Sequence, residues 1–133
     1  MKKIILGLVL FLSMQACSEK LEMNKVANTK WILSEWPSKT LPTSAQATLS
    51  FDAEGKIGGK SFCNSYGGNT VIADGTIKFE QIFSTKMFCT EFAQAENDYQ
   101  ADLQTINTAK VSDTQLQLLK DGVVIMVFKK DSQ

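Results

Sequence analysis

The sequence contains no histidine and no arginine among its 133 residues. Without histidine it has no imidazole for acid–base catalysis, for activating a nucleophile or for binding a metal ion. Without arginine it has no planar guanidinium to hold a phosphate or carboxylate through two parallel hydrogen bonds. Its fourteen lysines are balanced by fourteen Asp and Glu residues, so the basic face that nucleic acid requires is not expected. We therefore expect no nucleic-acid partner, and an enzyme is the least expected class.

The first sixteen residues have the pattern of a removable secretory leader. Two lysines precede an apolar stretch at residues 4–14, which is shorter than the about 20 residues of a permanent membrane helix. Gln15-Ala16-Cys17 then places a small residue directly before a cysteine, which resembles a bacterial lipobox. The pattern predicts a lipoprotein signal peptide at residues 1–16 and acylation of Cys17. The alternative is ordinary cleavage near Ala16, which leaves Cys17 as a spare thiol.

Acylation of Cys17 would anchor the mature chain in a bacterial cell envelope, because several acyl chains hold a protein stably at a membrane. Residues 17–27 are mostly polar, and we expect them to form the lipidated N-terminus and a tether. Ser18 resembles an outer-membrane sorting signal of enteric bacteria, which predicts an outer-membrane location facing the periplasm. The expected partners are the membrane, through acyl chains on Cys17, and an envelope protein. The chain itself is expected to be a monomer.

Beyond residue 27 the apolar residues recur with a period of two, which is typical of strands with one buried face. Residues 31–36 predict a first strand, which Pro37 ends, and residues 47–51 predict a second one. Hairpins are expected at Ala73-Asp74-Gly75 and at Asp121-Gly122, where turn residues separate alternating segments. The inward set of the last hairpin is expected to be Leu116, Leu118, Val124, Met126 and Phe128.

One segment has the spacing of a helix instead. Its apolar stripe consists of Phe92, Ala95, Tyr99, Leu103 and Ile106. Thr90 is the expected N-cap, and Asp98 and Asp102 are expected on a solvated face rather than as an acid–base pair. Together these elements predict an α+β, mainly β fold, with a strongly curved antiparallel sheet or small barrel of about eight strands and one helix.

A glycine-rich segment at residues 58–68 is the first candidate for chemistry. Gly59-Lys60-Ser61 matches the end of a phosphate-binding loop, but Glu54 stands where that motif begins with glycine, and no helix is expected to follow. We therefore expect no nucleotide and no cofactor here. Glycines at this density within a strand pattern indicate bulges or close backbone approach.

Cys63 and Cys89 are the second candidate. Two thiols without a histidine cannot complete a tetrahedral zinc site, so no metal is expected, and their separation is not that of a C-x-x-C redox motif. In an oxidising envelope we expect them to form a disulfide. Closing a loop of about 27 residues would stabilise the fold by roughly 3–4 kcal/mol in the chain-entropy model. Free buried thiols and a reactive thiol are the alternatives.

Several short motifs occur along the chain in a characteristic order. They are Trp31-Ile32-Leu33, Thr48-Leu49-Ser50-Phe51-Asp52, Gly59-x-Ser61-x-Cys63-Asn64-x-Tyr66-x-Gly68, Ser84-Thr85-Lys86-Met87-Phe88-Cys89 and a helix containing Glu96. In this order they resemble the META domain, a family that includes the bacterial heat-shock protein HslJ and many small envelope lipoproteins. The resemblance spans about residues 27–129. Phe62, where the family commonly has Gly, and Lys86, where it usually has Arg, depart from the pattern.

The resemblance implies a META domain at residues 28–133, built from a curved antiparallel sheet and one helix and without established catalytic residues. It also implies a motif cluster, structural or binding, next to Cys63 and Cys89. The members of this cluster are Asn64, Tyr66, Gly68, Thr85 and Met87. Within it we expect Asn64 to bond the backbone of the glycine-rich turn.

Family members are associated with envelope stress, the heat-shock response and drug tolerance. The sequence is therefore interpreted as a non-enzymatic, lipid-anchored envelope protein of this type. One alternative is a small-ligand carrier, since small barrels can hold an apolar molecule. Another is a protein-interaction or inhibitor module that acts through an exposed edge or loop such as residues 37–47.

Overall fold

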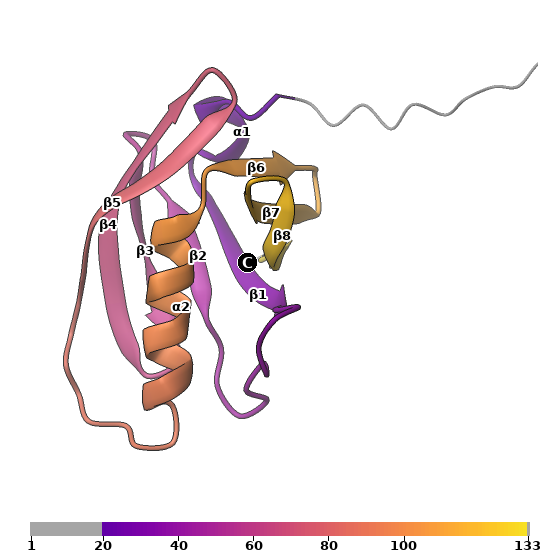
Figure 1. Cartoon of the computed structure of the whole chain (residues 1–133). Coiled ribbons are helices and arrows are strands. Elements are labelled where there is room, and N and C mark those ends of the chain that lie inside the picture. The colour runs from indigo at the N-terminus through magenta and orange to yellow at the C-terminus, as the bar shows by residue number, and fades with distance from the viewer. Residues whose placement is uncertain (1–19, 133) are drawn as a thin grey trace, which may run out of the picture.

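The computed structural model describes residues 20–132, whose strands close into an antiparallel barrel (Figure 1). The strands are β1 (Thr29–Glu35), β2 (Thr48–Phe51), β3 (Lys56–Ser61), β4 (Asn64–Ala73), β5 (Thr76–Ser84), β6 (Thr108–Val111), β7 (Gln115–Lys120) and β8 (Val123–Lys130). Each strand pairs with its neighbour in sequence, and β8 pairs with β1. The predicted α+β, mainly β fold of about eight antiparallel strands is confirmed.

The interior of the barrel is filled by the side chains that the period of two points inward. Trp31, Leu49, Leu116 and Phe128 are fully buried. They come from four different strands, so the strands share one apolar core, and this shared core fixes their register.

One member of the predicted inward set, Val124, is not buried. A bulge between Leu118 and Leu119 shifts the register of β7 against β8, so that Leu118 pairs with Met126 and Leu119 pairs with Val124. The extra residue, Ile125, packs against the core. The prediction for Val124 was wrong because a bulge interrupts the alternation.

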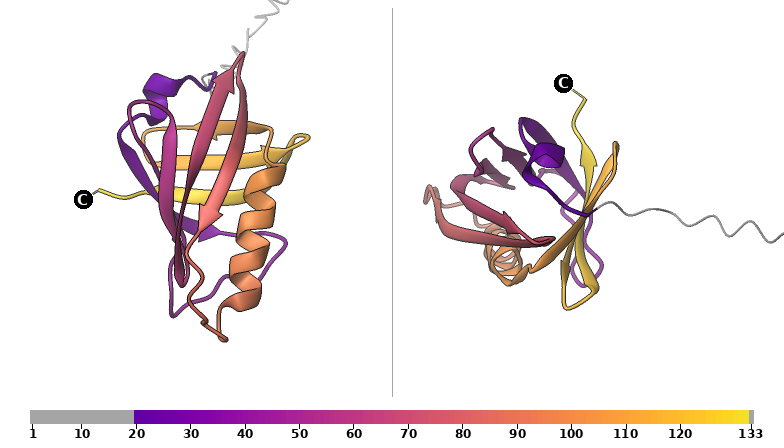
Figure 2. Two further views of the ribbon diagram at one scale, coloured as in Figure 1. Left: turned by 90° about the vertical axis from the view of Figure 1, so that its left-hand side faces the viewer. Right: turned by 90° about the horizontal axis from the view of Figure 1, so that it is seen from above.

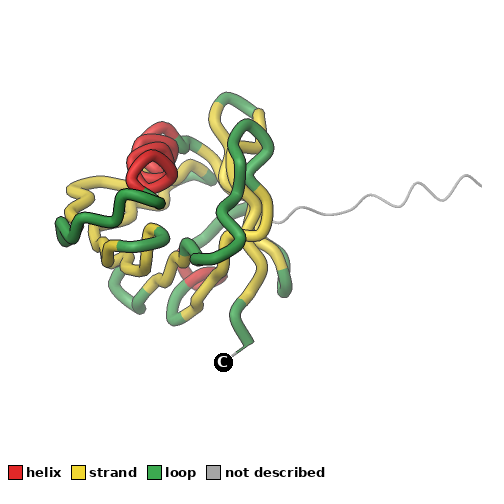
Figure 3. Tube along the Cα trace, turned by 90° about the horizontal axis from the view of Figure 1, so that it is seen from below, coloured by secondary structure: helices red, strands yellow, loops and turns green. Residues whose placement is uncertain are grey.

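Helix α2 (Ala93–Thr105) runs beside β5 (Figure 2), and it is seen end-on at the edge of the ring of strands in Figure 3. β5 and β6 are joined by a single residue pair, Thr76 with Thr108. The strand pairing of the barrel is therefore shortest between β5 and β6. Helix α2 contacts β5 beside this short pairing. The helix begins two residues later than expected, since its N-cap residue is Phe92 and not Thr90. No side chain caps this end of the helix.

The two aspartates of α2 lie on a face that is only partly exposed to solvent. Asp102 accepts a hydrogen bond from the indole N–H of Trp36 at 2.9 Å, and Asp98 lies 3.9 Å from the amino group of Lys39. Both partners lie in the chain between β1 and β2. The expected solvated face is only partly present, because the chain between β1 and β2 packs on this side of the helix.

The N-terminal part of the described chain is packed rather than extended. A short helix, α1 (Met23–Val26), precedes β1, and Leu21 and Val26 are buried in the core. The packed chain therefore starts within the segment 17–27 that was expected to be a tether. The predicted signal peptide and Cys17 lie outside the described residues. Among residues 20–132 no helix is long and apolar enough to cross a membrane.

Candidate functional site

The glycine-rich segment forms the β3–β4 hairpin. Ser61 pairs with Asn64, which leaves Phe62 and Cys63 as the two turn residues. Phe62 has a φ of +72°, and the N–H of Cys63 donates to the carbonyl of Ser61 at 3.0 Å. A bond between residues two apart around a positive φ is a γ-turn of the rare, strained type, which glycine adopts more readily than phenylalanine.

Packing of the Phe62 ring compensates for this strain. The ring is buried and stacks on Trp36 with centroids 5.9 Å apart, and it meets Tyr99 edge-on at 6.0 Å. The departure of this chain from the usual family glycine therefore adds an aromatic side chain to the contact between the hairpin and α2.

A Phe62→Gly variant is expected to unfold with a free energy about 2 kcal/mol lower than the parent chain. Relief of the strained backbone is worth about 1–3 kcal/mol, whereas loss of a buried phenylalanine costs about 3–5 kcal/mol. Urea unfolding measures the difference. Phe62→Ala is the matched control, because it loses the ring but keeps the strain and should be less stable than Phe62→Gly. A glycine variant more stable than the parent would contradict this balance.

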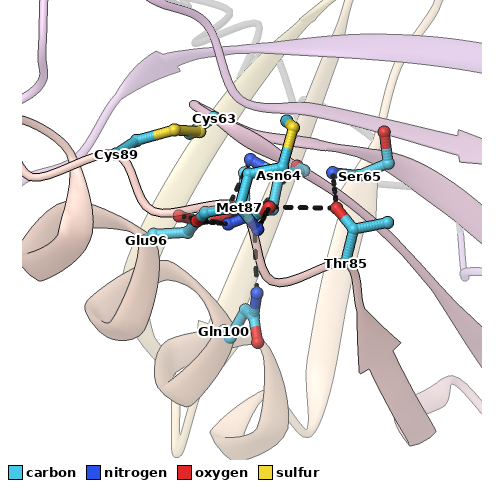
Figure 4. The surroundings of a disulfide bond; sticks show 9 residues. Cys63, Asn64, Ser65, Thr85, Met87, Cys89, Glu96 and Gln100 are labelled. Carbon is cyan, nitrogen blue, oxygen red and sulfur yellow. Dashed lines mark hydrogen bonds between the residues drawn. A yellow bond between two sulfur atoms is a disulfide. The ribbon is translucent and has the colours of Figure 1, made fainter.

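The carboxylate of Glu96, on α2, is buried beneath the same hairpin with only 7% of the residue exposed. Its Oε1 accepts hydrogen bonds from the Ser61 hydroxyl and from the Asn64 backbone N–H, both at 2.8 Å. Its Oε2 accepts a third from the Asn64 side-chain amide at 3.0 Å (Figure 4). All three partners are donors, so the carboxylate joins the helix to the end of the hairpin as a pure acceptor.

The Asn64 side chain continues this network into the loop after β5. Its Oδ1 accepts from the backbone N–H of Met87 at 2.7 Å and from the Thr85 hydroxyl at 3.0 Å. Its Nδ2 also donates to the Met87 carbonyl at 3.1 Å. Asn64 was expected to bond the backbone of its own turn. Its side chain instead bridges two distant segments, because the β4–β5 hairpin folds the loop back over it.

The disulfide between Cys63 and Cys89 is present and joins the same two segments (Figure 4). The two Cα atoms lie 6.3 Å apart, which is within the usual range for a disulfide. The predicted pairing is therefore confirmed. Among residues 20–132 no three histidine, cysteine or acidic side chains lie close enough together to hold a metal ion.

The motif cluster is only partly brought together. Asn64, Thr85 and Met87 meet in the network, whereas the Tyr66 ring points into the barrel, where its hydroxyl donates to the Thr48 carbonyl at 2.6 Å. Gly68 allows β4 to approach β5 closely, since a Cβ at this position would lie 2.9 Å from the Glu80 carbonyl oxygen.

Ser61 and Glu96 are the network members whose roles sequence reasoning missed. Glu96 could have been found by its position, because it lies three residues before Tyr99 and so falls on the apolar stripe of α2. An ionisable residue on the buried side of a helix requires polar partners. Nothing in the local sequence identifies Ser61 and Asn64 as those partners, which come from a hairpin more than thirty residues earlier.

Tyr66 and Tyr99 form a second buried polar contact, with their hydroxyl oxygens 2.8 Å apart. Burial raises the pKa of Tyr66 and raises that of Tyr99 well above its usual value. For Tyr99, the neighbouring Tyr66 contributes in the same direction. Both phenols are therefore neutral in the folded protein, where they act as hydrogen-bonding groups of the core.

Alkaline titration is expected to show no tyrosinate absorbance until the protein unfolds, because these are its two tyrosines. An unfolded tyrosine ionises near pH 10, and the raised pKa of the folded form means that the unfolded state loses its protons first. The contribution of the two buried tyrosines to the free energy of unfolding is thus fully present below about pH 10. Above that pH it falls by up to about 1.4 kcal/mol per pH unit for each tyrosine. Tyrosinate absorbance appearing near pH 10 with an unchanged circular dichroism spectrum would contradict this.

An open pocket of about 370 Å³ lies between the loop after β5 and the first half of α2. Its lining includes the polar residues Asn64, Ser84, Thr85, Asn97 and Gln100. The lining also includes the exposed residues Met87 and Phe88 and the charged residues Lys86 and Glu96. Of the polar lining residues, Ser84, Asn97 and Gln100 take no part in the Glu96–Asn64 contacts and can offer hydrogen bonds to a ligand.

Comparison with known families and structures gives consistent results. A family model described as the META domain matches residues 24–132. An NMR structure of a protein from Burkholderia xenovorans is similar with a TM-score of 0.72 and 25% identity, over 84% of this chain and 87% of that one. No curated protein matches the chain.

Two further solved structures share the fold at lower identity. A second NMR structure has a TM-score of 0.65 at 17% identity and covers 82% of this chain and 94% of its own. A crystal structure of a DUF4847 family protein from Bacteroides vulgatus has a TM-score of 0.56 at 12% identity and covers 84% of this chain and 96% of its own. At such identities the likeness concerns the fold alone.

Proposed function

The chain belongs to the META domain family, and on that premise we propose that it is a non-enzymatic, lipid-anchored protein of the bacterial cell envelope. The observation that carries the proposal is the placement of Cys17 directly after an apolar leader and four residues before Leu21, the first buried residue described. Acyl chains on Cys17 would hold the barrel close to a bilayer, at the outer membrane and facing the periplasm.

The disulfide supports an envelope location, because disulfides persist in oxidising compartments such as the periplasm. A non-enzymatic role is supported by the state of the polar groups at the site. The carboxylate oxygens of Glu96 accept three hydrogen bonds, and the phenols of Tyr66 and Tyr99 are buried and neutral. A general acid or base needs a free site that faces a substrate. Glu96 lines the open pocket, but its oxygens already accept three hydrogen bonds, and the two phenols lie in the core.

The family supports a further part of the proposal, a link to envelope stress or the heat-shock response and to drug tolerance. Of the two alternatives, a small-ligand carrier requires an open lumen. The core is instead filled by large side chains such as Trp31, Tyr99 and Phe128. The interaction module is favoured by a specific observation, the exposed apolar loop after β5, whereas in the segment 37–47 Leu41 and Ala45 pack partly against the core.

The test of the anchor is the intact mass of the full chain expressed with its own leader in a bacterial host. We expect a mature chain that begins at Cys17 and carries the mass of its acyl chains, and that sediments with the membranes. The Cys17→Ala variant should lack this mass and leave the membrane fraction. A parent chain that is cleaved near Ala16 without added mass, and is found free in the periplasm, would overturn the proposal.

A further inference from the structure

Met87 and Phe88 are exposed in the loop that joins β5 to α2, and Phe83 is exposed near the end of β5. Five large apolar residues of the described chain are exposed, and three of them fall within residues 83–88. The exposed fractions are 69% for Phe83, 60% for Met87 and 89% for Phe88. Single exposed apolar residues are common on protein surfaces, but a cluster of large ones marks a surface that binds something. We refer to residues 83–88 as the apolar loop.

The apolar loop is held in place by polar contacts rather than by burial of its own side chains. The backbone N–H of Thr85 donates to the Ser65 carbonyl at 2.9 Å, and the N–H and carbonyl of Met87 both bond the Asn64 side chain. The disulfide fixes Cys89, just beyond the loop. Anchors thus recur at every second residue, and the apolar side chains of Met87 and Phe88 stay free. A surface ordered in advance loses little conformational entropy on binding.

The pocket beside the loop indicates the chemistry of the ligand. Asn64 and Thr85 are engaged in the network, so the lining residues that can bond the N–H and carbonyl groups of a peptide backbone are Ser84, Asn97 and Gln100. The exposed side chains of Met87 and Phe88, which also line the pocket, match apolar side chains. We propose that the apolar loop and this pocket bind an extended segment of a partner protein, with aromatic or aliphatic side chains against Met87 and Phe88 and its main chain along α2.

Position and charge favour a protein over a lipid bilayer as the occupant. The apolar loop lies at the opposite end of the molecule from α1 (Figures 1 and 2). Lys20, by contrast, lies beside Gly75 at the end that carries the β4–β5 turn. An anchor at Cys17 would hold the loop away from its own membrane, a step that rests on the proposed function. Lys86 is the single charged residue of the apolar loop, so the electrostatic attraction of the loop to an anionic membrane is weak.

The probe for this site is a library of random linear peptides displayed on phage, selected against the full chain as the bacterial host produces it. We expect selected peptides to be rich in aromatic and aliphatic residues. Phe88→Ser and Met87→Ser should each weaken their binding at least about tenfold, as removal of an interface anchor does. Val123→Ser is the matched control, since Val123 is also exposed, at 62%, but lies in the β7–β8 hairpin. Its affinity should stay within about twofold of the parent.

Four outcomes would overturn the proposal. They are the selection of no peptide, equal weakening by Val123→Ser, binding to phosphatidylethanolamine–phosphatidylglycerol vesicles that Phe88→Ser abolishes, and a dimer that Phe88→Ser dissociates. The last two would assign the loop to a membrane or to a second copy. Because these side chains are exposed, the variants should melt like the parent chain. A chain that lacks acylation at Cys17 but binds the peptides would reject the anchor and keep the binding site.

Discussion

A Glu96→Ala variant is expected to lose about 3 kcal/mol of unfolding free energy, a large effect for a single polar residue. The carboxylate accepts three hydrogen bonds in a buried position, and a bond to a charged acceptor contributes about 1.5–3 kcal/mol. The cost of burying the carboxylate, which the variant no longer bears, offsets much of the sum of the three. Removal of the carboxylate leaves the backbone N–H of Asn64 buried without an acceptor, which costs a further about 1–3 kcal/mol. The Ser61 hydroxyl loses less, because it can still donate to the Asn64 carbonyl at 3.3 Å.

Urea unfolding with Asp98→Ala as the matched control tests this expectation. Asp98 is an acidic residue of the same helix, but its ion pair with Lys39 is long and partly exposed, so its removal should cost less than about 1 kcal/mol. A double-mutant cycle between Glu96→Ala and Asn64→Ala should show strong coupling, because both truncations break the same bonds. Equal effects of Glu96→Ala and Asp98→Ala would show that the buried network does not stabilise the fold.

Removing the disulfide is the second large change. The Cys63→Ala, Cys89→Ala double variant is expected to be roughly 3–4 kcal/mol less stable, since the bond joins two residues that are 26 positions apart and restricts the unfolded chain. The folded barrel should persist, because Asn64 still holds the loop at Met87 through its side-chain hydrogen bonds.

Reduction provides an independent control for this variant. A reducing agent should bring the urea midpoint of the parent chain to that of the double variant and leave the double variant unchanged. Alkylation followed by intact mass should add two groups at Cys63 and Cys89 only after reduction. Labelling of both thiols without reduction, or an unchanged midpoint in the double variant, would contradict a stabilising disulfide.

The sequence predicts the barrel well because one physical rule governs most of it. A strand with one buried face alternates apolar and polar residues, and β2, around Leu49, follows this rule without interruption. The rule fails at Val124, where a bulge inserts one residue. It also misses the packing of Leu21 and Val26, since isolated apolar residues in a polar segment carry no period.

The site is predicted less completely, because its parts meet only in the folded chain. The disulfide could be expected, since it follows from two cysteines in an oxidising compartment. The partners of Asn64 could not, because local reasoning favours bonds within the turn, whereas Met87 and Glu96 come from segments more than twenty residues away. The exposure of the Phe88 side chain could not be predicted either, because it depends on the hydrogen bonds that the network makes to the backbone of the loop.

The central claim is that the Glu96–Asn64 network orders the apolar loop before any partner binds. Amide hydrogen exchange measured by NMR on the free protein tests it most directly. The N–H groups of Thr85 and Met87, which donate to Ser65 and Asn64, should exchange at least about a hundredfold more slowly than those of Lys86 and Phe88. Glu96→Ala should speed exchange at Met87. Equally fast exchange at all four positions in the parent chain would contradict the claim.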